Sequence, residues 1–417
     1  MFFSALFAAI AALVLAFPSV KGIEISPPSP DGQPWRVAYN RSSLVDTSRK
    51  DPYNPSEDRK VAYSIFMPID GGLNDVTPRD TCTGYTDNEY MPELTAKANN
   101  LQFFGDENAN VFEQLSFQTC ASASGETPAD VFPLIIFEPA VGTSRFIYNQ
   151  LARQLSANGA YVVTVDHPYD APIVEFADAD PIESNGAIAL DAFKVNMPWD
   201  NTIEKAVNTR IGDINAVIKE LESEDTLSKL FPGVKFVAGN QVPPTKEIFM
   251  VGHGLGGTVA TSMGANDPRV KWTMNLSGST PVIKEDTLSY TIFFGREDYR
   301  SDNDTAWQES KKHFAGPQVE WTYMSAEQFD YSDLPLVVAL VDPNKEAEAK
   351  GLGTPYKVMD KDLMSTFIAL SCFTEAYFRD TILPGWAPPH HGEDRDRIHR
   401  CMGWFGAAMR LRVPGQS

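Results

Sequence analysis

The sequence predicts an α/β protein with a mostly parallel central sheet, helices on both faces of that sheet and a cap insertion. Three observations support this fold class. From Pro133 onward, short apolar runs of strand length alternate with segments of helical periodicity. One of these runs, residues 247–251, leads directly into a glycine-rich turn and then a helical pattern. The chain has 417 residues, of which 43% are hydrophobic, so it can bury one large core.

The N-terminal part, residues 23–130, is expected to form an arm followed by outer strands. Residues 23–59 are rich in Pro, Ser, Asp and Asn, which predicts an extended surface arm without a core of its own. Residues 60–67 are β-rich and alternate in polarity, which predicts an outer strand. The stretch that follows, up to residue 130, is loop-rich.

The core of the domain is expected over residues 131–345, where strand and helix patterns alternate. The expected strands are 134–138, 161–166, 247–251, 271–276, 290–294 and 319–324. The expected helices are 144–156, 203–221, 257–264 and 304–313. Residues 172–201 have no strong period, and so long an insertion beside the strand ends is a candidate cap over a pocket. Residues 346–417 are expected to form a helical extension of the same domain.

Residues 1–22 open with an apolar stretch that breaks at Pro18. This pattern predicts a secretory signal peptide, because the run is shorter than the ~20 residues that a membrane span needs. A short membrane anchor is the alternative. No later stretch is long and apolar enough to cross a bilayer. We therefore expect a protein without a stable membrane span that enters the secretory pathway and is secreted.

The composition also limits partners and cofactors. The net charge of −20 argues against binding to nucleic acid or to anionic membrane surfaces. No spacing of Cys or His offers four convergent ligands for zinc. The run Gly252-His-Gly-Leu-Gly-Gly257 has the glycine spacing G-x-G-x-G-G, which differs from the G-x-G-x-x-G of a dinucleotide site. We expect no metal and no organic cofactor, and the oligomeric state stays open.

The four cysteines form two pairs that are well separated in the sequence. An oxidising compartment would favour joining them. The local choice among the three connectivities pairs Cys82 with Cys120 and Cys372 with Cys401. Four free, buried thiols are the alternative.

Three sequons for N-glycosylation are present. Those at Asn40 and Asn303 lie in polar surroundings, and we expect both to be acceptors. The third, at Asn275, closes an apolar run, so its side chain is expected to be buried.

The turn after residues 247–251 is the most informative motif of the chain. It reads Val251-Gly-His-Gly-Leu-Gly-Gly257. In the pattern G-x-S-x-G, a strained turn from strand to helix exposes a nucleophilic serine, and small neighbours allow the backbone to turn sharply. The place of the serine is held here by Gly254, which has no side chain and cannot attack an acyl carbon.

Two further segments also consist of an apolar run that leads into a turn. They read Pro133-Leu-Ile-Ile-Phe-Glu-Pro-Ala-Val-Gly-Thr-Ser-Arg145 and Val163-Thr-Val-Asp-His-Pro-Tyr-Asp170. Together with the glycine-rich turn they resemble the platelet-activating-factor acetylhydrolase group of α/β-hydrolases, in particular its secreted fungal relatives. The resemblance spans roughly residues 130–340. It implies the α/β-hydrolase fold and a serine esterase that releases acyl chains from phospholipids.

The resemblance also implies where a catalytic triad would stand. The serine of the family falls on Gly254, its aspartate falls on Ser277, and its histidine falls on Gln328. A serine needs a nearby imidazole to take its proton and a carboxylate to orient that imidazole, and loss of a triad costs several orders of magnitude in rate. Three serines could be considered as replacement nucleophiles, but none is on the sharp turn that would expose the reacting oxygen: Ser262, Ser277 and Ser279. Ordinary ester hydrolysis at this turn is therefore disfavoured.

A frame that could bind a carbonyl oxygen is expected to remain. The backbone N–H of Leu255 opens the helix after the turn, and a second N–H would come from the loop Ala140-Val141-Gly142. His167 follows a strand and lies between two acidic residues, where a structural role is the favoured interpretation. A minority hypothesis makes His167 a general base, since imidazole titrates near neutral pH.

Three functional hypotheses follow from these residues. The first is a triad-deficient hydrolase relative that binds an apolar carbonyl-containing small molecule or a lipid, with a non-hydrolytic biosynthetic step such as cyclisation, condensation or isomerisation. The second is a pseudoenzyme that binds a lipid or a partner protein without catalysis. The third is an esterase with a displaced triad.

Overall fold

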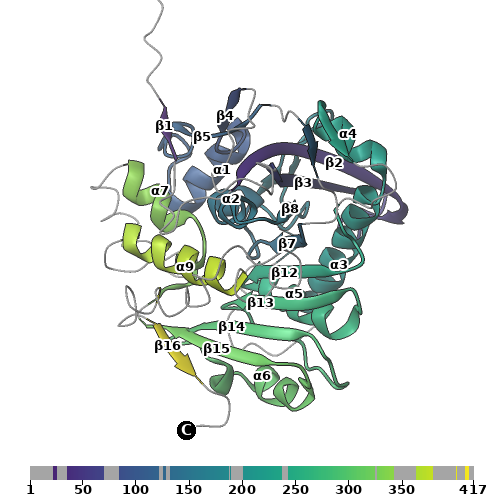
Figure 1. Ribbon diagram of the computed structural model, residues 1–417, viewed down its shortest axis with the longest axis vertical. Helices are drawn as coiled ribbons and strands as arrows, with labels where there is room; N and C mark the ends of the chain where they lie inside the picture. Colours follow the sequence, from purple (N-terminus) through teal and green to yellow (C-terminus); the bar gives the residue numbers. More distant parts are fainter. Residues whose placement is uncertain are drawn as a thin grey trace, which may run out of the picture.

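A large mixed β-sheet dominates the computed structural model (Figure 1). The sheet has 12 strands in the order β1-β5-β2-β3-β8-β7-β12-β13-β14-β15-β16, with β4 attached to β5. The structure describes residues 22–25, 35–69, 84–121, 125–127, 132–186, 188, 201–236, 243–324, 326–341, 363–378, 401 and 409–412.

The centre of the sheet is parallel. Six strands pair side by side in the order β8-β7-β12-β13-β14-β15. They are β7 (Leu134–Glu138), β8 (Tyr161–Asp166), β12 (Ile248–His253), β13 (Val270–Leu276), β14 (Tyr290–Arg296) and β15 (Gln318–Tyr323). Every residue of β7, β8 and β12 is buried, as required of strands that helices cover on both faces. The predicted strands and the α/β-hydrolase fold are thereby confirmed.

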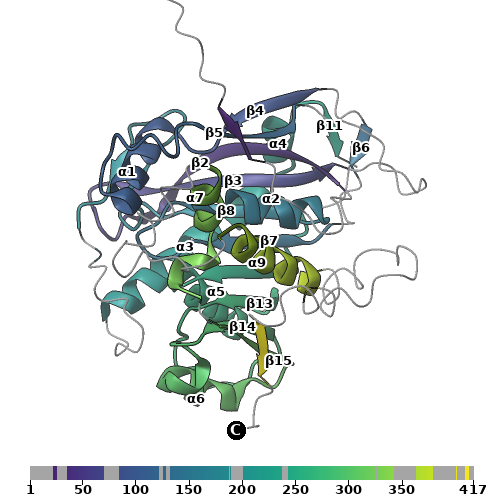
Figure 2. The same ribbon diagram turned by 90° about the vertical axis from the view of Figure 1, so that its left-hand side faces the viewer.

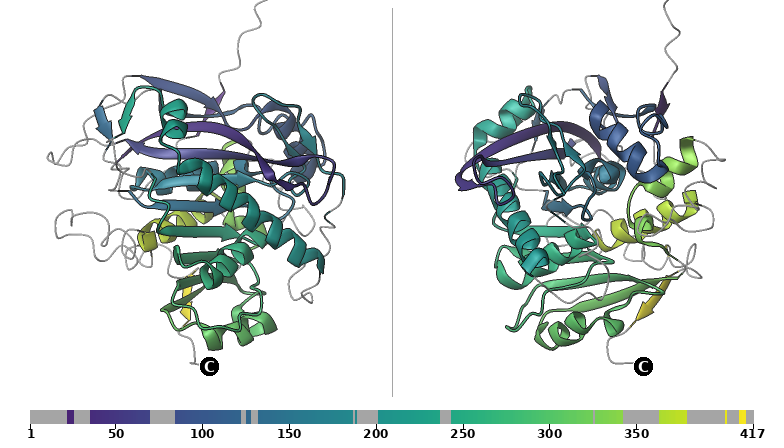
Figure 3. Two further views of the ribbon diagram at one scale, coloured as in Figure 1. Left: turned by 90° about the vertical axis from the view of Figure 1, so that its right-hand side faces the viewer. Right: turned by 180° about the vertical axis from the view of Figure 1, so that it is seen from behind.

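Helices cover the two faces of the sheet. Ile135 and Phe137 of β7 face the side that α2 (Asn149–Ala157), α7 (Leu334–Val341) and α9 (Leu363–Tyr377) cover (Figure 2). Leu134 and Ile136 face α3 (Asn201–Leu221) and α5 (Leu255–Asn266) on the other side (Figure 3). Successive side chains of a strand point to opposite faces, so one short apolar run supplies both halves of the core.

The N-terminal part differs from the expected surface arm. Residues Arg36–Lys50 form a 15-residue strand, β2, which pairs antiparallel with β3 (Asp58–Ile69). The expectation of a surface arm is therefore wrong for residues 36–50, and residues 26–34 lie outside the described residues. Most residues of β2 are only partly buried or exposed, so its side chains are polar and its composition resembles a loop, while its backbone hydrogen bonds hold it in the sheet.

The outer layer beyond β2 is built from short elements. These are β1 (Ile23–Glu24), β4 (Tyr85–Glu89), α1 (Glu93–Phe104), β5 (Leu115–Cys120) and β6 (Gly125–Thr127), together with α4 (Glu224–Leu230) and β11 (Val234–Phe236). After β14 come α6 (Thr305–Ser310) and short 3-10 turns, which agree with the helical pattern expected over 304–313. No helix in the described ranges is both long enough and apolar enough to span a membrane.

The described part of the candidate cap is a small hairpin of β9 (Ile173–Val174) and β10 (Ile182–Glu183). The other cap residues, 187 and 189–200, lie outside the described residues. In the C-terminal extension α9 is helical as expected, but β16 (Met409–Arg412) pairs antiparallel with β15. The strand expected over 319–324 is thus present as β15, but it is not the edge strand of the sheet.

A disulfide joins Cys372 of α9 to Cys401, with their Cα atoms 5.9 Å apart. The second expected pairing is only partly described. Cys120 is disulfide-bonded, and Cys82 lies outside the described residues, as does the predicted signal peptide up to residue 21. None of the cysteines in the part of the chain that the structure describes is free. The alternative of four free thiols is therefore wrong.

Candidate functional site

Gly254 lies between β12 and α5, at the apex of the predicted turn. Its backbone has φ 54° and ψ −120°, a conformation that residues with a side chain rarely adopt. The turn is also tightly packed. A Cβ atom on Gly252 would lie 2.1 Å from the carbonyl oxygen of Gly256, and one on Gly256 would lie 2.3 Å from that of Glu138. The glycine-rich sequence therefore folds into the sharp turn that the motif predicts.

The structure brings together the three positions to which the resemblance assigns a triad, Gly254, Ser277 and Gln328. Ser277 follows β13 directly, and its Oγ donates a hydrogen bond to Oε1 of Gln328 at 3.3 Å. Gln328 opens the 3-10 turn after β15, and its Nε2 would lie 3.3 Å from a Cβ atom placed on Gly254. Residues that are 74 positions apart in the sequence thus share one site, which agrees with the positions that the resemblance assigned to them.

Arg296 is a site residue that the sequence analysis missed. It is the last residue of β14, and its Nη1 donates to Ser277 Oγ at 3.1 Å. The Arg296 side chain is 7% exposed and pairs at 2.9 Å with Asp298, whose side chain is 71% exposed. The end of the strand before Asp298 could have indicated it, because neighbouring parallel strands bring their carboxyl ends together.

His253 lies under the turn and is fully buried. Its Nε2 is 2.9 Å from Nε2 of Gln328, and its Nδ1 is 2.8 Å from the hydroxyl of Tyr148. Burial lowers the pKa of His253 to about 3, and the positive charge of Arg296 acts in the same direction. The imidazole is therefore neutral. Since an amide nitrogen can only donate, Nε2 accepts from Gln328 and the proton sits on Nδ1, facing Tyr148.

The loop after β7 was expected to supply a second N–H donor. The Ala140 N–H donates to the Tyr148 hydroxyl at 3.1 Å, and the Gly142 N–H donates to Asp170 Oδ1 at 2.9 Å. Among the described residues, the Val141 N–H has no hydrogen-bond acceptor. At the start of α5, helix geometry leaves the Leu255 N–H without an intrahelical acceptor. Of the four predicted donors, Val141 and Leu255 are thus the two whose N–H groups have no acceptor among the described residues.

Side chains from outside the loop hold it in place. Arg210 of α3 donates to the carbonyl oxygen of Pro139 at 2.6 Å and to that of Ala140 at 3.4 Å. Gln102 of α1 donates to the carbonyl oxygen of Gly142 at 2.7 Å. Arg210 also pairs with Asp170 at 2.8 Å, and that carboxylate accepts the Gly142 N–H. The direction of the Val141 amide is therefore fixed by hydrogen bonds on both sides of it.

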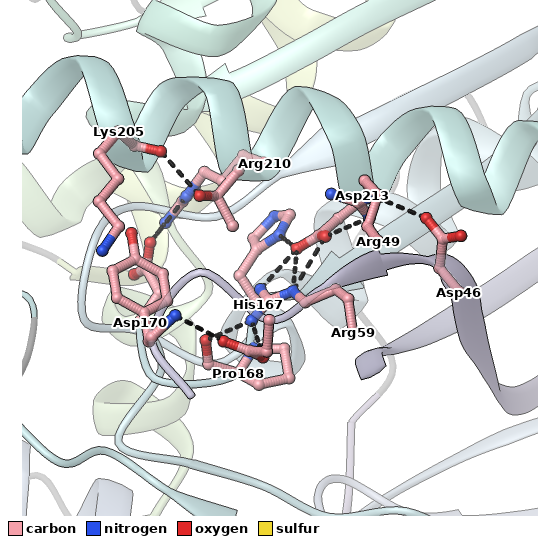
Figure 4. Close-up of polar contacts among 12 residues, drawn as sticks. Asp46, Arg49, Arg59, His167, Pro168, Asp170, Lys205, Arg210 and Asp213 are labelled. Carbon is pink, nitrogen blue, oxygen red and sulfur yellow. Dashed lines mark hydrogen bonds and ion pairs between the residues drawn. The ribbon is translucent and has the colours of Figure 1, made fainter. Parts of the chain in front are cut away.

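Arg210 belongs to a buried cluster of charged side chains behind the loop, part of which Figure 4 shows. His167 is 2.9 Å from Asp213 through Nδ1 and 2.9 Å from Glu138 through Nε2. Arg59 pairs with Asp213 at 2.7 Å and, on the other side, with Asp51. These side chains are nearly all inaccessible to solvent.

The cluster assigns a structural role to His167. Burial alone would lower its pKa, but the carboxylates of Glu138 and Asp213 outweigh burial, so the pKa of His167 is raised. Both ring nitrogens bind carboxylates and the side chain is 2% exposed. No lone pair is left to take a proton from a substrate. The geometry therefore does not support the general-base hypothesis, and it agrees with His167 as a positioning residue.

The three sequons differ in their surroundings. Asn275 is buried, as expected, and its amide donates to Thr261 Oγ1 at 3.0 Å. Asn40 lies in β2, half-buried, with its amide bonded to the carbonyl oxygen of Leu230. Asn303 lies at the exposed end of a 3-10 turn. Glycosylation of Asn40 and Asn303 stays a prediction. No group of three or more His, Cys, Asp or Glu side chains in the described ranges is arranged to hold a metal ion.

Comparisons with known proteins identify a family and a relative that this chain resembles. The pattern of the family described as platelet-activating factor acetylhydrolase, isoform II, matches residues 53–306, a range that contains Gly254 and Ser277 and ends before Gln328. A probable 1-alkyl-2-acetylglycerophosphocholine esterase of Arthroderma benhamiae is 24% identical over 298 residues, which cover 67% of this chain and 68% of that protein.

A solved structure shares the fold. The ferulic acid esterase of Streptomyces cinnamoneus superposes with a TM-score of 0.61 and 19% identity, covering 93% of this chain and 98% of that chain. At this identity the likeness shows the fold alone. The superposition covers nearly all of both chains, so the shared architecture extends beyond the parallel core.

Proposed function

Because this chain belongs to the platelet-activating factor acetylhydrolase, isoform II family, we propose that it keeps the carbonyl-binding frame of an esterase without its serine nucleophile. It binds an apolar carbonyl-containing small molecule or a lipid at the turn around Gly254. The observation that carries the proposal is the meeting of Gly254, Ser277 and Gln328 in one site. None of the three side chains can perform the role that the resemblance gives to its position.

The chemistry of the site supports binding and polarisation of a carbonyl group. The N–H groups of Val141 and Leu255 are free to donate hydrogen bonds to a carbonyl oxygen of a ligand, as in the oxyanion sites of hydrolases. Gln328 cannot take a proton from a nucleophile, because an amide nitrogen is not basic. His253 is neutral and both its ring nitrogens are engaged. Polarisation without attack suits a non-hydrolytic step such as cyclisation, condensation or isomerisation.

A fluorophosphonate probe tests the absence of a nucleophile. The probe reacts with activated serines only, so we expect no labelling of the native protein, with a related active serine esterase labelled in parallel as the positive control. Labelling of one serine that disappears in its alanine variant would show a displaced triad and overturn the proposal. Unfolded protein is the negative control, because labelling that persists after unfolding would show non-specific reaction of the probe.

Ligand binding is tested on the same preparation. Native mass spectrometry of the purified protein, followed by extraction, identifies any molecule that co-purifies with the site. We expect the extracted ligand to contain a carbonyl group and an apolar chain. Incubation of that ligand with native protein and with boiled protein then separates catalysis from simple binding: a changed product distribution supports the non-hydrolytic step, and unchanged ligand supports a pseudoenzyme.

Secretion belongs to the same proposal. The apolar opening of the chain and the disulfide between Cys372 and Cys401 both suit the oxidising secretory route. Expression of the full chain in a eukaryotic host should deliver protein to the medium with a new N-terminus near residue 23. A glycosidase-sensitive mass would show N-glycosylation, and its loss in Asn303→Gln would locate the glycan at the exposed sequon. Protein that stays in the cell with Met1 intact would contradict secretion.

A further inference from the structure

We propose that the ligand group at this turn is a carboxylate, so that the protein binds a small aliphatic monocarboxylic acid in its ionised form. The inference rests on the proposed function and names the chemistry of its ligand. One carboxylate oxygen takes the place of the carbonyl oxygen between the Val141 and Leu255 N–H groups. The second occupies the space that a nucleophilic side chain would fill in an esterase.

The space for the second oxygen comes from Gly254. A Cβ atom at this position would lie 3.3 Å from Nε2 of Gln328 and 3.4 Å from Cβ of Ala140, which is closer than most side chains approach their neighbours, so the glycine keeps open a narrow gap lined by these two groups. The residue is half-buried, so the space opens to solvent. A serine esterase fills this space with its own side chain, and an acid that reached the oxyanion donors would meet the serine oxygen. Glycine removes that obstacle.

A donor faces the same space. Nε2 of Gln328 carries two hydrogens, and only one of them is directed at His253. The other can be donated to a ligand oxygen beside Gly254. The donor set for the two oxygens is therefore the amides of Val141 and Leu255 and the side-chain amide of Gln328. All three are donors, and such a set suits an acceptor that carries charge on both oxygens.

The charge around the site also favours an anion. An esterase places a buried carboxylate at the position of Ser277, and here a neutral hydroxyl stands there. Arg296 remains beside it, with its Nη1 3.1 Å from Ser277 Oγ. Its ion-pair partner, Asp298, is 71% exposed and therefore screened by water. The charge nearest the site is thus the positive charge of the Arg296 guanidinium instead of the negative charge of a carboxylate. The N–H donors at the start of α5 also favour an anion.

The shape of the site selects a planar carboxylate over a tetrahedral anion. The wall next to Gly254 includes the methyl group of Ala140, and the ring of Phe329 packs against the neighbouring His253 ring with 5.5 Å between the ring centroids. Two oxygens in one plane match two donor directions, whereas phosphate would direct further oxygens at apolar groups and leave them without donors. An aliphatic chain on the carboxylate would follow the apolar wall.

The test is calorimetric titration of the full-length secreted chain near neutral pH with octanoate, methyl octanoate, 2-nonanone and octan-1-ol. These probes share chain length and differ in the head group. We expect octanoate to bind about tenfold or more tightly than the ester and the ketone, the equivalent of about 1.4 kcal/mol. Gln328→Glu keeps the size of the side chain but adds a like charge, and it should lower octanoate affinity at least about tenfold while changing ketone affinity little.

Two matched controls accompany the variants. Gln318→Glu makes the same change at the start of β15, far along the strand from the site, and should leave binding unchanged. Gly254→Ala fills the space for the second oxygen and should remove the preference for the acid. Gly105→Ala repeats that change at another glycine with positive φ, 73°, whose Cβ would meet nothing within 4 Å. Circular dichroism and thermal melts show whether each variant is folded. If Gly254→Ala does not fold, the affinities of Gln328→Glu decide whether the carboxylate proposal stands.

The outcomes separate the two proposals. Equal or weaker binding of octanoate, with ketone or ester binding that depends on Gly254, refutes the carboxylate and leaves carbonyl binding intact. Binding of octanoate that both Gln328→Glu and Gly254→Ala leave unchanged places the acid elsewhere and also refutes the inference. Absence of binding for all four probes contradicts the inference and the proposed binding function together. A preference for octanoate that the two variants abolish, and the two controls do not, supports it.

Discussion

Nε2 of Gln328 lies 2.9 Å from Nε2 of His253, so the residue to which the resemblance assigns the histidine donates to a neighbouring imidazole. In an esterase of this family the side chain at that position accepts a proton from serine. Here Gln328 donates instead of accepting, and the Nδ1–H of His253 donates to the hydroxyl of Tyr148. That hydroxyl also accepts a hydrogen bond from the Ala140 N–H. The turn at Gly254 and the loop Ala140-Val141-Gly142 are thereby joined by one chain of hydrogen bonds. This chain contains no base that could activate a nucleophile.

Rebuilding the triad should create esterase activity. The triple variant Gly254→Ser, Ser277→Asp, Gln328→His places all three groups where the fold already brings their backbones together. Hydrolysis of p-nitrophenyl acetate should exceed that of the native protein at least about tenfold, far below the full effect of an evolved triad. Fluorophosphonate labelling at residue 254 is the second readout.

The double variant Gly254→Ser, Gln328→His is the matched control for the rebuilt triad. Arg296 would pair with an aspartate at 277 and keep it ionised, so the triple variant should be the more active of the two. Activity in the double variant that equals the triple would show that residue 277 does not orient the new histidine. A folded triple variant that neither hydrolyses the ester nor reacts with the probe would contradict the assignment of the three positions.

The buried charge cluster should contribute strongly to stability. Asp213→Asn removes a carboxylate that binds Arg59 and His167, and it leaves two buried positive groups with reduced compensation. We expect a loss of about 3–5 kcal/mol in the free energy of unfolding, measured by urea denaturation. The loop held by Arg210 should lose its order as well, so ligand affinity should fall before the protein unfolds.

An exposed ion pair provides the comparison for Asp213→Asn. Lys312 and Glu309 lie 2.6 Å apart with side chains 62% and 58% exposed. Lys312→Ala should change the free energy of unfolding by about 0.5 kcal/mol or less. Equal losses in the two variants would mean that burial does not strengthen the cluster, contrary to the structure.

The parallel core could be predicted from the sequence because its strands are buried on both faces. Runs such as Leu134–Glu138 and Tyr161–Asp166 are mostly apolar and of strand length, so they can be recognised as buried strands without knowledge of their neighbours. β2 and β16 are different, because they join the sheet at its outer parts, where backbone hydrogen bonds suffice and polar side chains are tolerated. Composition alone cannot separate such strands from loops.

The candidate site was predictable to the extent that it follows from a local turn. Gly254 could be placed at the apex because a strand, a glycine-rich run and a helix are consecutive in the sequence. The place of Arg296 at a strand end could indicate it as a candidate, but its contact with Ser277 could not be assigned, since that contact depends on β13 and β14 being neighbours in the sheet. Likewise, Val141 could not be separated from Ala140 and Gly142, because the acceptors of those two amides come from Tyr148 and Asp170.

His253 should make the protein sensitive to acid. Burial lowers its pKa in the folded state from 6.5 to about 3, so the unfolded chain binds a proton that the folded chain refuses. Its contribution to stability is therefore complete above about pH 6.5 and is lost as the pH falls towards 3. The difference in free energy of unfolding between native protein and His253→Asn should fall by up to about 1.4 kcal/mol per pH unit in that range. A difference that stays constant with pH would contradict the buried, neutral imidazole.

Asp333 should show the opposite dependence on pH. It is fully buried, and it accepts hydrogen bonds from the Tyr90 hydroxyl at 2.9 Å and from the Gln150 and Leu151 N–H groups at 2.7 and 3.1 Å, at the start of α2. Burial outweighs these bonds and raises the pKa of Asp333 from 3.8 to about 7. Between these values the folded state holds a proton that the unfolded state has released.

Stability from Asp333 therefore increases as the pH falls from about 7 to about 4, where the unfolded carboxyl also becomes protonated. Asp333→Asn removes this titration, so the native protein should gain stability over the variant by up to about 1.4 kcal/mol per pH unit across the range. Urea denaturation of both proteins at several pH values measures the difference. If the native protein instead lost stability relative to the variant on acidification, the carboxylate would be ionised in the fold, and the helix terminus together with Tyr90 would outweigh burial.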